Sequence, residues 1–392
     1  MRKRLIVISS HPFSDGRIYK HLQTVQPFFD KVIYIRFETR KKKQHFEYPL
    51  KKIEYYEIQT HSLCFPFSVL EKRIALFLRL SCKLKYIIRE LQKNMPNFET
   101  LIHCHDPLSL PKAVFLKQKL HGHLIYDRHE YFETWRTFGL FPEESMIERH
   151  FSDYVDAVVG VTKEIAKYAN KICRNTISTA VIPNYPSAKM IAFDKVHQKI
   201  WSFDPSGKIN VVYIGSLSRD NDLLFNVIDS LLENNKQIYV TLGGRNMSSK
   251  FSSELVKYQK KFKDRFSFIG EVDYKRVLQV QEEAHLGLYF ADEKKTLPSS
   301  PNKIFEYLNC GTVPFCRVKL SKSDLDVAQT GYLFSPENEK SLIIQKAQEI
   351  AKNPHFLKQK MLDCVRVGSR KRWENVSEKY LVLYKELLKI TI

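Results

Sequence analysis

The segment SSPNKIFEYLNCGTVPF, residues 299–315, concentrates groups that would bind phosphate. Its first residues, including Ser300 and Asn302, are typical of a helix start. Free N–H groups at a helix N-terminus attract a phosphate, and Lys303 in the first turn adds a formal positive charge. Glu306 lies on the same helix face, where it would accept hydrogen bonds from a sugar or ribose hydroxyl. The alternative is an ordinary capped helix with a surface ion pair.

Two other loops carry a glycine followed by an arginine. Gly215 ends a strand-like run and Arg219 follows it, which makes a second candidate phosphate contact. Gly16 would allow close backbone approach to a ligand, and Arg17 would then face an anion. A tight turn at Gly215 and a solvated Arg17 are the alternatives. The chain contains neither GxxxxGK[ST] nor GxGxxG, which removes the main support for a P-loop hydrolase or a dinucleotide enzyme.

Histidines follow two predicted strands of the first half. His103 and His105 lie in HCHDP, and His129 lies in YDRHE. The ends of parallel strands face ligands, and Asp106 and Glu130 beside these histidines would orient an imidazole or bind hydroxyls. The spacing lacks a third close ligand, which argues against a metal site. Packing in the core is the alternative for each histidine.

Strand and helix patterns alternate along the first half and would position these groups. Strand-like runs occupy 4–10, 31–37, 100–106, 123–130 and 156–162, with helical patterns between them. A basic, less regular stretch occupies 38–60. This alternation predicts an α/β fold with a parallel sheet covered on both faces.

The pattern lapses over 183–208, where three prolines occur, and then restarts. The second half has strand-like runs at 208–216, 237–244, 266–272, 285–291 and 312–318. We therefore expect two Rossmann-like parallel-sheet domains, 1–190 and 191–372, facing a central cleft, followed by a helix at 373–392.

The charge of the chain is concentrated near its start. Its 392 residues carry a formal net charge of +20, and residues 1–120 hold 23 Lys and Arg against 10 Asp and Glu. Such a surface suits an anionic partner, which would be nucleic acid, an acidic membrane face or a phosphorylated substrate. A basic excess that serves only solubility is the alternative.

Apolar runs and cysteines bear on location. The first strongly apolar run, 5–9, is far shorter than the ~18–20 residues of a membrane span and too short for a signal peptide. Seven cysteines form no CxxC pair, which is typical of reduced thiols in the cytoplasm. We expect a cytoplasmic protein without zinc or a disulfide framework.

In order and spacing, several segments resemble glycosyltransferase family 4, whose members are retaining enzymes of the GT-B fold. They are HPFSDGRIYKHLQTV, HCHDPLSLPKAVF, YDRHEYFETW, VTKEIAKY, VIPN, YIGSLSRD, FIGEVDY and SPNKIFEYLNCGTVPF. The closing WENVSEKYLVLYKELL is similar to that family's last helix, which returns to the N-terminal domain. The resemblance implies a hexosyltransferase that moves a sugar from a nucleotide diphosphate donor to an acceptor hydroxyl, without a required metal.

The resemblance also implies roles for individual residues. The catalytic residues would be His129, which contacts the donor sugar, with Lys303 and Arg219. The donor-binding residues would be Gly16 and Gly215 near the phosphates, Val272 at the base, Ser300, Asn302 and Lys303 at the diphosphate, and Glu306 at the ribose. Because the N-terminal domain of this fold binds the acceptor, the acceptor-side residues would be Arg17, His105, Asp106 and Glu130.

Two departures from the family pattern concern the donor. Pro298 stands where the first glutamate of the family's pair is expected, so recognition of the sugar is less predictable. Ser216 and Asn221 stand in the phosphate loop where a basic residue and a glycine are common, so Arg219 alone would supply that loop's charge.

The transfer is physically consistent with these residues. A diphosphate leaving group gains negative charge as the glycosidic bond breaks, and fixed N–H groups with Lys303 and Arg219 would stabilise it in place of a metal. The sequence offers no obvious pair of facing carboxylates for a double displacement. We therefore prefer a front-face displacement in which the departing phosphate helps to deprotonate the acceptor.

The basic first domain suits an acceptor at an acidic membrane surface. The segment 71–93 combines apolar and basic residues, and a saccharide or lipid-linked saccharide is the acceptor that fits best. Packing of the apolar face on the sheet is the alternative. Bacterial surface polysaccharide synthesis is the pathway that we infer from the family's common use.

Three other functions remain open at this point. A sugar-nucleotide epimerase shares the GT-B architecture but needs acid and base groups around the donor sugar. A nucleic-acid-binding protein would explain the charge, but no zinc, helix-turn-helix or RNP element is recognisable. An inactive partner subunit of a glycosyltransferase would explain the missing glutamate.

Overall fold

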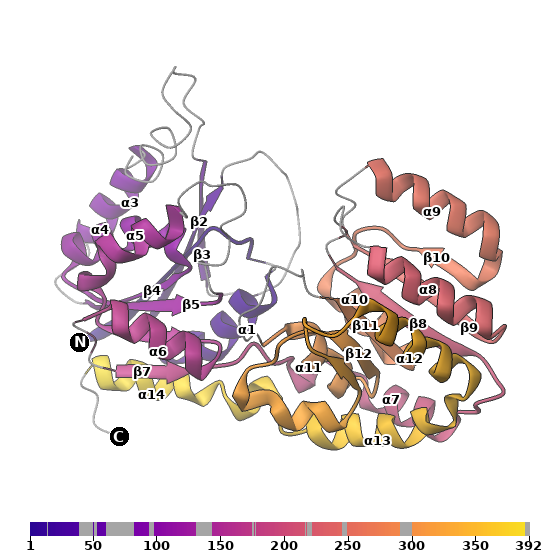
Figure 1. Ribbon diagram of the computed structural model, residues 1–392. Helices are drawn as coiled ribbons and strands as arrows, with labels where there is room; N and C mark the ends of the chain where they lie inside the picture. The colour runs from indigo at the N-terminus through magenta and orange to yellow at the C-terminus, as the bar shows by residue number, and fades with distance from the viewer. Residues whose placement is uncertain are drawn as a thin grey trace. The chain divides into compact units, whose positions relative to one another are not determined.

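The computed structural model describes the chain apart from residues 14, 39–49, 51–52, 60–81, 94–97, 131–142, 175, 177, 216, 218–221, 245–248, 291–299 and 389–392. The chain folds into two compact units (Figure 1). Unit 1 comprises Met1–Pro183 with Val376–Ile392, and unit 2 comprises Asn184–Asn375. The first division therefore falls at the start of the proline-containing stretch.

The sheet of unit 1 is parallel, with the strand order β3-β2-β1-β4-β5-β6-β7. Its strands are β1 (Arg2–Ser9), β2 (Lys31–Glu38), β3 (Ile53–Gln59), β4 (Phe98–His105), β5 (His123–Arg128), β6 (Ala157–Gly160) and β7 (Ser178–Val181). β1 is buried throughout from Arg4 to Ser9, because helices cover both faces of its β-branched run. The strand order reverses between β1 and β4, and ligands of such sheets bind beyond the strand ends at that point.

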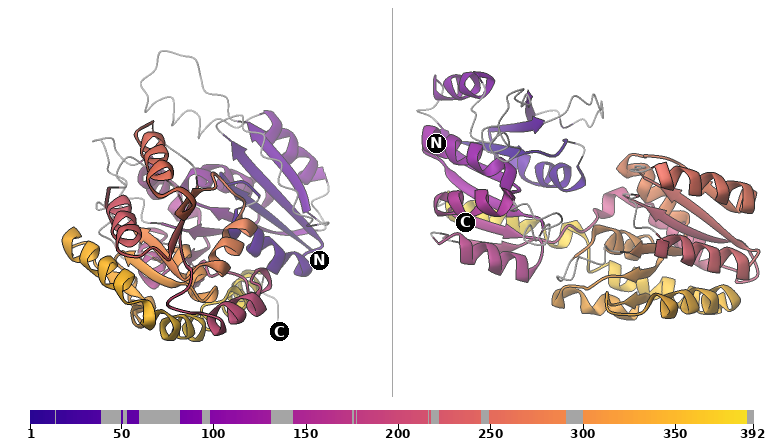
Figure 2. Two further views of the ribbon diagram at one scale, coloured as in Figure 1. Left: turned by 90° about the vertical axis from the view of Figure 1, so that its right-hand side faces the viewer. Right: turned by 45° about the horizontal axis from the view of Figure 1, so that its top comes forward.

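Helices cover this sheet in two layers. They are α1 (Gly16–Val25), α3 (Cys82–Lys93), α4 (Leu110–Leu120), α5 (Glu143–Phe151), α6 (Lys163–Ile172) and α14 (Glu378–Leu387). α4 packs against both α3 and α5. The last helix, α14, lies beside β7 and α1, so the end of the chain completes unit 1 (Figures 1 and 2).

Alternate residues of the first sheet face different layers, as the two-residue period of a strand requires. Ile8 and Cys104 belong to the hydrophobic cluster that includes the buried side chains of α3 and α4. His103 and His105 flank Cys104 in β4 and therefore point to the opposite face. Asp127 of β5 is in register with His105 and shares this face. The layer between the sheet and α1 and α14 thus receives polar side chains.

The sheet of unit 2 is also parallel, with the order β10-β9-β8-β11-β12-β13. Its strands are β8 (Ile209–Ile214), β9 (Ile238–Gly243), β10 (Phe266–Phe268), β11 (Leu286–Phe290), β12 (Val313–Arg317) and β13 (Tyr332–Phe334). The order reverses between β8 and β11. The segments that follow these two strands therefore flank the expected ligand position.

Seven α-helices accompany this sheet within the described part of unit 2. They are α7 (Phe193–Trp201), α8 (Asp222–Asn234), α9 (Ser249–Phe262), α10 (Tyr274–Glu283), α11 (Asn302–Asn309), α12 (Lys340–Lys352) and α13 (Leu357–Gly368). α8 packs against α12, whereas α7, α10, α11 and α13 pack against one another. Pro301, Gly311 and the buried face of α11 fit the helix predicted from the sequence.

Three element predictions were wrong. The stretch 38–60 contains β3, an edge strand whose charged residues obscure the pattern. α7 lies within 183–208, and its two buried side chains are too few to show a clear periodicity. The run 266–272 is a strand only at its start, because Gly270 adopts a φ of +70° and turns the chain.

The segment proposed for a membrane contact is described only over Cys82–Lys93. There Leu84, Ile87, Ile88 and Leu91 are buried in the core of unit 1, so this apolar face packs on the protein itself. Among the described residues, no helix has both the length and the apolar character needed to cross a bilayer.

Candidate functional site

The loops after β1 and β4 bring two side chains together where the strand order of unit 1 reverses. His11 Nε2 lies 2.6 Å from Asp106 Oδ2. His129, which follows β5, places its Nδ1 3.4 Å from the same carboxylate oxygen. Two predicted residues, Asp106 and His129, thus meet, and His11 joins them although the sequence analysis missed it.

Asp106 has a strained backbone conformation and a buried carboxylate oxygen without a hydrogen bond in the described part of the chain. Its φ of 62° with a ψ of 155° is a backbone conformation that residues with a side chain rarely adopt. Its buried Oδ1 has no hydrogen-bond partner among the residues that the structure describes. Strain of this kind costs about 1–3 kcal/mol and gathers at functional sites. The observation marks this edge of the sheet as a candidate site.

The His11–Asp106 pair has opposite pKa shifts. Burial lowers the pKa of His11, but the hydrogen bond and charge of Asp106 outweigh it and raise this pKa to about 9. Burial raises the pKa of Asp106, but the charge of His129 and the hydrogen bond from His11 outweigh it and lower this pKa. The pair is therefore an ion pair at neutral pH.

Asp127 is a fully buried anion of unit 1. The Arg17 guanidinium donates to both carboxylate oxygens, at 2.8–3.1 Å, and Tyr380 donates its hydroxyl at 2.9 Å. Burial raises the pKa of Asp127, but the charges of Arg17 and His129 and the hydrogen bonds from His103 and His129 together outweigh it and hold this pKa well below its ordinary value. The anion that Arg17 faces is thus Asp127 rather than a ligand.

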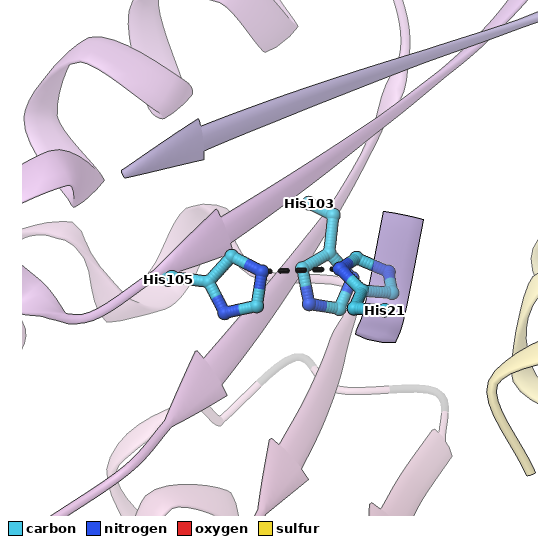
Figure 3. Close-up of side chains that lie close together, drawn as sticks. All are labelled: His21, His103 and His105. Atoms are coloured by element: carbon cyan, nitrogen blue, oxygen red, sulfur yellow. Dashed lines mark hydrogen bonds between the residues drawn. The ribbon is translucent and has the colours of Figure 1, made fainter. Parts of the chain in front are cut away.

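Three histidines fill the layer between the sheet and α1. His21 of α1 lies against His103 and His105 of β4, and all three are fully buried (Figure 3). His21 Nδ1 and His105 Nε2 are 3.1 Å apart, which is a hydrogen bond. Burial lowers the pKa of each of the three. His105 was predicted to lie on the acceptor side, but it is buried and has no direct access to a substrate in this structure.

The other predicted residues of unit 1 lie at its surface. Gly16 begins α1, and the Asp15 carboxylate caps that helix by accepting from the backbone N–H groups of Arg17 and Ile18. Glu130 follows His129 and is exposed.

In unit 2, glycines follow three neighbouring strands, so no side chain covers the backbone at these strand ends and the backbone is bare there. Gly244 follows β9 with a φ of +122°, and a Cβ there would lie 1.8 Å from the Gly215 carbonyl oxygen. The Gly244 N–H donates to the Gly270 carbonyl at 2.6 Å. A side chain at Gly244 would therefore not fit, whereas a methyl group at Gly215 would meet only the flexible end of Lys303, so the backbone at these strand ends allows close approach by a ligand.

Lys303 reaches over this bare backbone from the first turn of α11. Its Nζ lies 5.0 and 5.4 Å from the ring centres of Tyr213 and Tyr289. Within the described parts of the chain, no hydrogen-bond or ion-pair partner contacts this ammonium. Burial lowers the pKa of Lys303. A desolvated cation beside bare backbone, at the start of a helix that no side chain caps, suits a phosphate.

Glu306 lies one turn further along α11 and is largely buried. Gln281 of α10 donates its Nε2 to Glu306 Oε2 at 3.2 Å. The buried Gln281 Oε1 has no partner among the described residues, so the amide is oriented by Glu306. This contact fixes the carboxylate, and no pattern in the sequence indicated it.

The remaining donor-side predictions lie around α11. The Ser300 hydroxyl donates to Asp324 Oδ2 at 2.9 Å, and Asp324 is paired with Lys371 at 3.1 Å. Asn302 is exposed at the first position of the helix. Val272 packs against the core that contains Val212, Ile214 and Tyr307, and Arg219 lies outside the described residues.

Among the residues that the structure describes, three groups of side chains have ligand atoms close enough to share a metal ion. They are His21, His103 and His105; His11, Asp106 and His129; and His105, Asp127 and His129. In the first group every ring nitrogen already has a hydrogen-bond partner. Independence from metal stays a prediction.

Solved structures resemble the whole chain. HepE of Anabaena in complex with UDP and glucose matches with a TM-score of 0.67 and 13% identity, over 99% of this chain and 100% of that one. Sucrose-phosphate synthase of Thermosynechococcus elongatus matches with a TM-score of 0.68 and 14% identity, over 100% of both chains. The chain has the GT-B fold. Trehalose-6-phosphate synthase OtsA, also a GT-B structure, matches with a TM-score of 0.63 and 14% identity, over 99% of both chains. No protein-family model and no curated protein matches the chain.

The GT-B architecture predicted from the sequence is thus confirmed. The sequence analysis missed five polar residues of unit 1, which are His11, His21, Asp127, Tyr380 and Tyr384. A signal for four residues of this layer was present, because Arg17 with His21, and Tyr380 with Tyr384, are spaced four apart on one helix face.

Proposed function

We propose that the protein is a retaining glycosyltransferase of the family 4 type. It transfers a hexosyl group from a nucleoside diphosphate sugar to a hydroxyl of a saccharide or a lipid-linked saccharide. The observation that carries the proposal is the half-buried Lys303 ammonium beside Gly215, at the end of the strand where the order of the unit 2 sheet reverses. The HepE structure that binds UDP-glucose supports the same class of donor.

In this proposal unit 2 holds the diphosphate. Lys303 and the free N–H groups of α11 neutralise its charge, and Arg219 joins them from the phosphate loop. Since the leaving diphosphate gains charge as the glycosidic bond breaks, these fixed groups stabilise the transition state more than the bound donor. They do so without a required metal.

Glu306 binds the ribose hydroxyls in this proposal. A carboxylate accepts hydrogen bonds only, which matches the two O–H donors of a ribose. Gln281 holds the carboxylate in place from the side away from solvent. The nucleoside end of the donor is thereby oriented along α11, and Val272 would lie at the base.

Unit 1 contributes His129, whose side chain is 16% exposed, and Asp106. The imidazole would contact the sugar of the donor. The displacement occurs on the face from which the diphosphate leaves: the acceptor oxygen bonds to the anomeric carbon, the bond to the phosphate oxygen breaks, and the acceptor proton passes to the departing phosphate. The anomeric configuration is then retained.

An acceptor at an acidic membrane surface is the part of the proposal that concerns unit 1 as a whole. The exposed face of α3 carries Lys85 and Arg89, while its apolar face is buried. The basic excess of residues 1–120 would attract anionic headgroups, about 1 kcal/mol for each basic residue near the surface. We place the reaction at the cytoplasmic face of a bacterial membrane, in surface polysaccharide synthesis.

Thermal unfolding with uridine, guanosine, adenosine and thymidine diphosphate sugars tests the proposal. Ligand at 100 times its Kd should stabilise the protein by about 2.7 kcal/mol. We expect one nucleotide series to bind, and Lys303→Ala and Glu306→Ala to lose the shift. Lys208→Ala is the matched control, because this exposed lysine lies over the Tyr239 ring at the other end of β8.

Three outcomes would contradict the proposal. No shift with any sugar nucleotide would remove the donor site, and an equal shift in Lys303→Ala would place it elsewhere. Conversion of the bound sugar nucleotide into its epimer, without transfer, would indicate the epimerase instead.

A further inference from the structure

A continuous chain of polar contacts crosses the layer between the sheet of unit 1 and its helices α1 and α14. It joins two carboxylates through four imidazoles and one phenol. At the inner end, Asp127 Oδ2 lies 3.3 Å from His103 Nε2, and His103 Nδ1 lies 2.9 Å from the Tyr384 hydroxyl. That hydroxyl contacts His21 Nε2, and His21 Nδ1 lies 3.1 Å from His105 Nε2. At the outer end, His105 Nδ1 lies 3.0 Å from His129 Nε2, and His129 Nδ1 lies 3.4 Å from Asp106 Oδ2.

Counting protons shows what this chain requires. Each neutral imidazole and the phenol supply one hydrogen, which makes five, whereas the chain has six contacts to fill. Both ends are ionised carboxylates, which only accept. The chain is therefore one proton short when all its imidazoles are neutral, and one added proton completes it.

The Asp127 end sets the direction of the hydrogen bonds. Because Arg17 and Tyr380 hold Asp127 as an anion, His103 must donate its Nε2–H to it. His103 Nδ1 then accepts from Tyr384. Tyr384 in turn accepts from His21, and the same order continues outward.

At the outer end, His105 Nδ1 lies 3.0 Å from His129 Nε2 and 3.4 Å from Asp127 Oδ2. The shorter contact is the one that continues this order, in which His105 accepts at Nδ1 from His129 Nε2–H. The Nδ1 atom of His129, beside Asp106, is the position left without a hydrogen.

We propose that this chain is a proton relay that fixes the His129 imidazole with its Nε2–H directed inward, so that only Nδ1 gains or loses a proton at the edge of the sheet. Tyr384 is its positioning residue. Its meaning for sugar transfer rests on the proposed function: a cationic His129 would face the anionic donor. The structure of the relay itself does not depend on that function.

The added proton belongs at the His129 end. Burial lowers the pKa of His21, His103 and His105, so these imidazoles resist a charge. Among the four imidazoles of the relay, His129 is the most exposed. It lies next to both carboxylates, 3.4 Å from Asp106 and 3.6 Å from Asp127.

Other charged groups surround that end as well. His11, whose ring stacks on His129 from the loop after β1, is a cation paired with Asp106. Arg17 of α1 is paired with Asp127, and Glu130 is the next residue in the chain. The charge of Arg17 opposes a proton on the inner histidines.

Tyr384→Phe separates this relay from simple packing. It removes one hydroxyl and keeps the ring. The remaining contacts from His21 through His105 and His129 to Asp106 are three, and three neutral imidazoles fill them in the reverse direction. The neutral form of His129 should therefore change from Nε2–H to Nδ1–H, and the chain should no longer need an added proton.

The experiment is a pH titration of the whole protein, labelled with ¹⁵N-histidine, and it is followed by two-bond proton–nitrogen correlation spectra. His129 is assigned from the signals that disappear in His129→Asn. In the wild type we expect Nε2 to keep its hydrogen throughout, while Nδ1 titrates. In Tyr384→Phe we expect neutral His129 to carry its hydrogen on Nδ1. We also expect the remaining relay to take up one proton fewer than the wild-type relay as the pH is lowered.

Tyr126→Phe is the matched control, because this buried phenol of the same sheet donates to Glu148, outside the relay. We expect it to leave the His129 spectra unchanged. The wild-type spectra test the proposal even where Tyr384→Phe does not fold.

Three results would overturn the relay. They are an Nδ1–H neutral form of His129 in the wild type, unchanged His129 signals in Tyr384→Phe, and a metal ion bound by His21, His103 and His105 in the purified protein. None of these readouts involves a sugar nucleotide. A relay present in a protein that binds no donor would refute the proposed function alone, and donor binding without the relay would refute only this inference.

Discussion

Lys303 Nζ lies 2.0 Å from the point that a Cβ on Gly215 would occupy. The ammonium thus uses the space that the missing side chain leaves, and the two residues form one site although they come from different segments. This relationship defines the floor of the candidate donor site.

Gly215→Ala should therefore weaken nucleotide binding without unfolding the protein. The new methyl group would displace the end of a flexible lysine, which costs little stability, but it would occupy the place of the ammonium and of the ligand. We expect the affinity for the donor to fall at least about tenfold, or 1.4 kcal/mol. Calorimetric titration measures it, with Gly207→Ala, in the half-buried bend before β8, as control. Unchanged affinity in Gly215→Ala would place the phosphate elsewhere.

Gln281→Met should weaken the binding of the nucleotide without abolishing it. The substitution keeps the volume of the side chain and deletes the hydrogen bond from Nε2 to Glu306. One such bond to a carboxylate contributes about 1.5–3 kcal/mol, so the Kd should rise by roughly tenfold or more. Titration with the nucleoside diphosphate and with inorganic diphosphate distinguishes the ends of the ligand, because only the former should weaken. Equal losses for both would argue against a ribose contact at Glu306.

Arg17→Met should destabilise unit 1 strongly. It leaves the Asp127 carboxylate buried without its main counter-charge, which costs about 3–5 kcal/mol. Urea unfolding at neutral pH measures the loss. Adding Asp127→Asn should restore part of the stability, since it removes the uncompensated charge. A fully stable Arg17→Met protein would show that the pair contributes little.

The His11–Asp106 pair predicts how stability depends on pH. The folded-state pKa of His11 is raised to about 9, above the ordinary value of about 6.5, so its contribution is complete below about pH 6.5 and lost as the pH rises through about 9. Burial lowers the pKa of His21, His103 and His105, which destabilises the protein below about pH 6.5. That effect is shared by His11→Ala and cancels in the difference.

Urea midpoints of wild type and His11→Ala at pH 6 and pH 10 check this prediction. The wild type should be the more stable protein at pH 6, and the difference should shrink at pH 10. A difference that grows with pH would mean that His11 is neutral in the folded protein.

The sequence predicted both parallel sheets and the position of Lys303 and Glu306, because local periodicity and helix-end signals determine them. It did not predict β3, whose glutamates suit an exposed edge but break the apolar pattern. It also missed the relay, since His21 and Tyr384 meet across 363 positions of sequence. Contacts that depend on which face of α14 meets α1 require the tertiary structure.

The stereochemistry of donor turnover tests the central claim most directly. The donor that binds is incubated with the protein and water in place of the acceptor, without added metal, and proton NMR follows the first anomer of the released sugar. A retaining transferase predicts release of the nucleoside diphosphate together with a sugar of the donor's configuration, and loss of both products in Lys303→Ala. A sugar of the opposite configuration, or turnover only with an added divalent ion, would contradict the account.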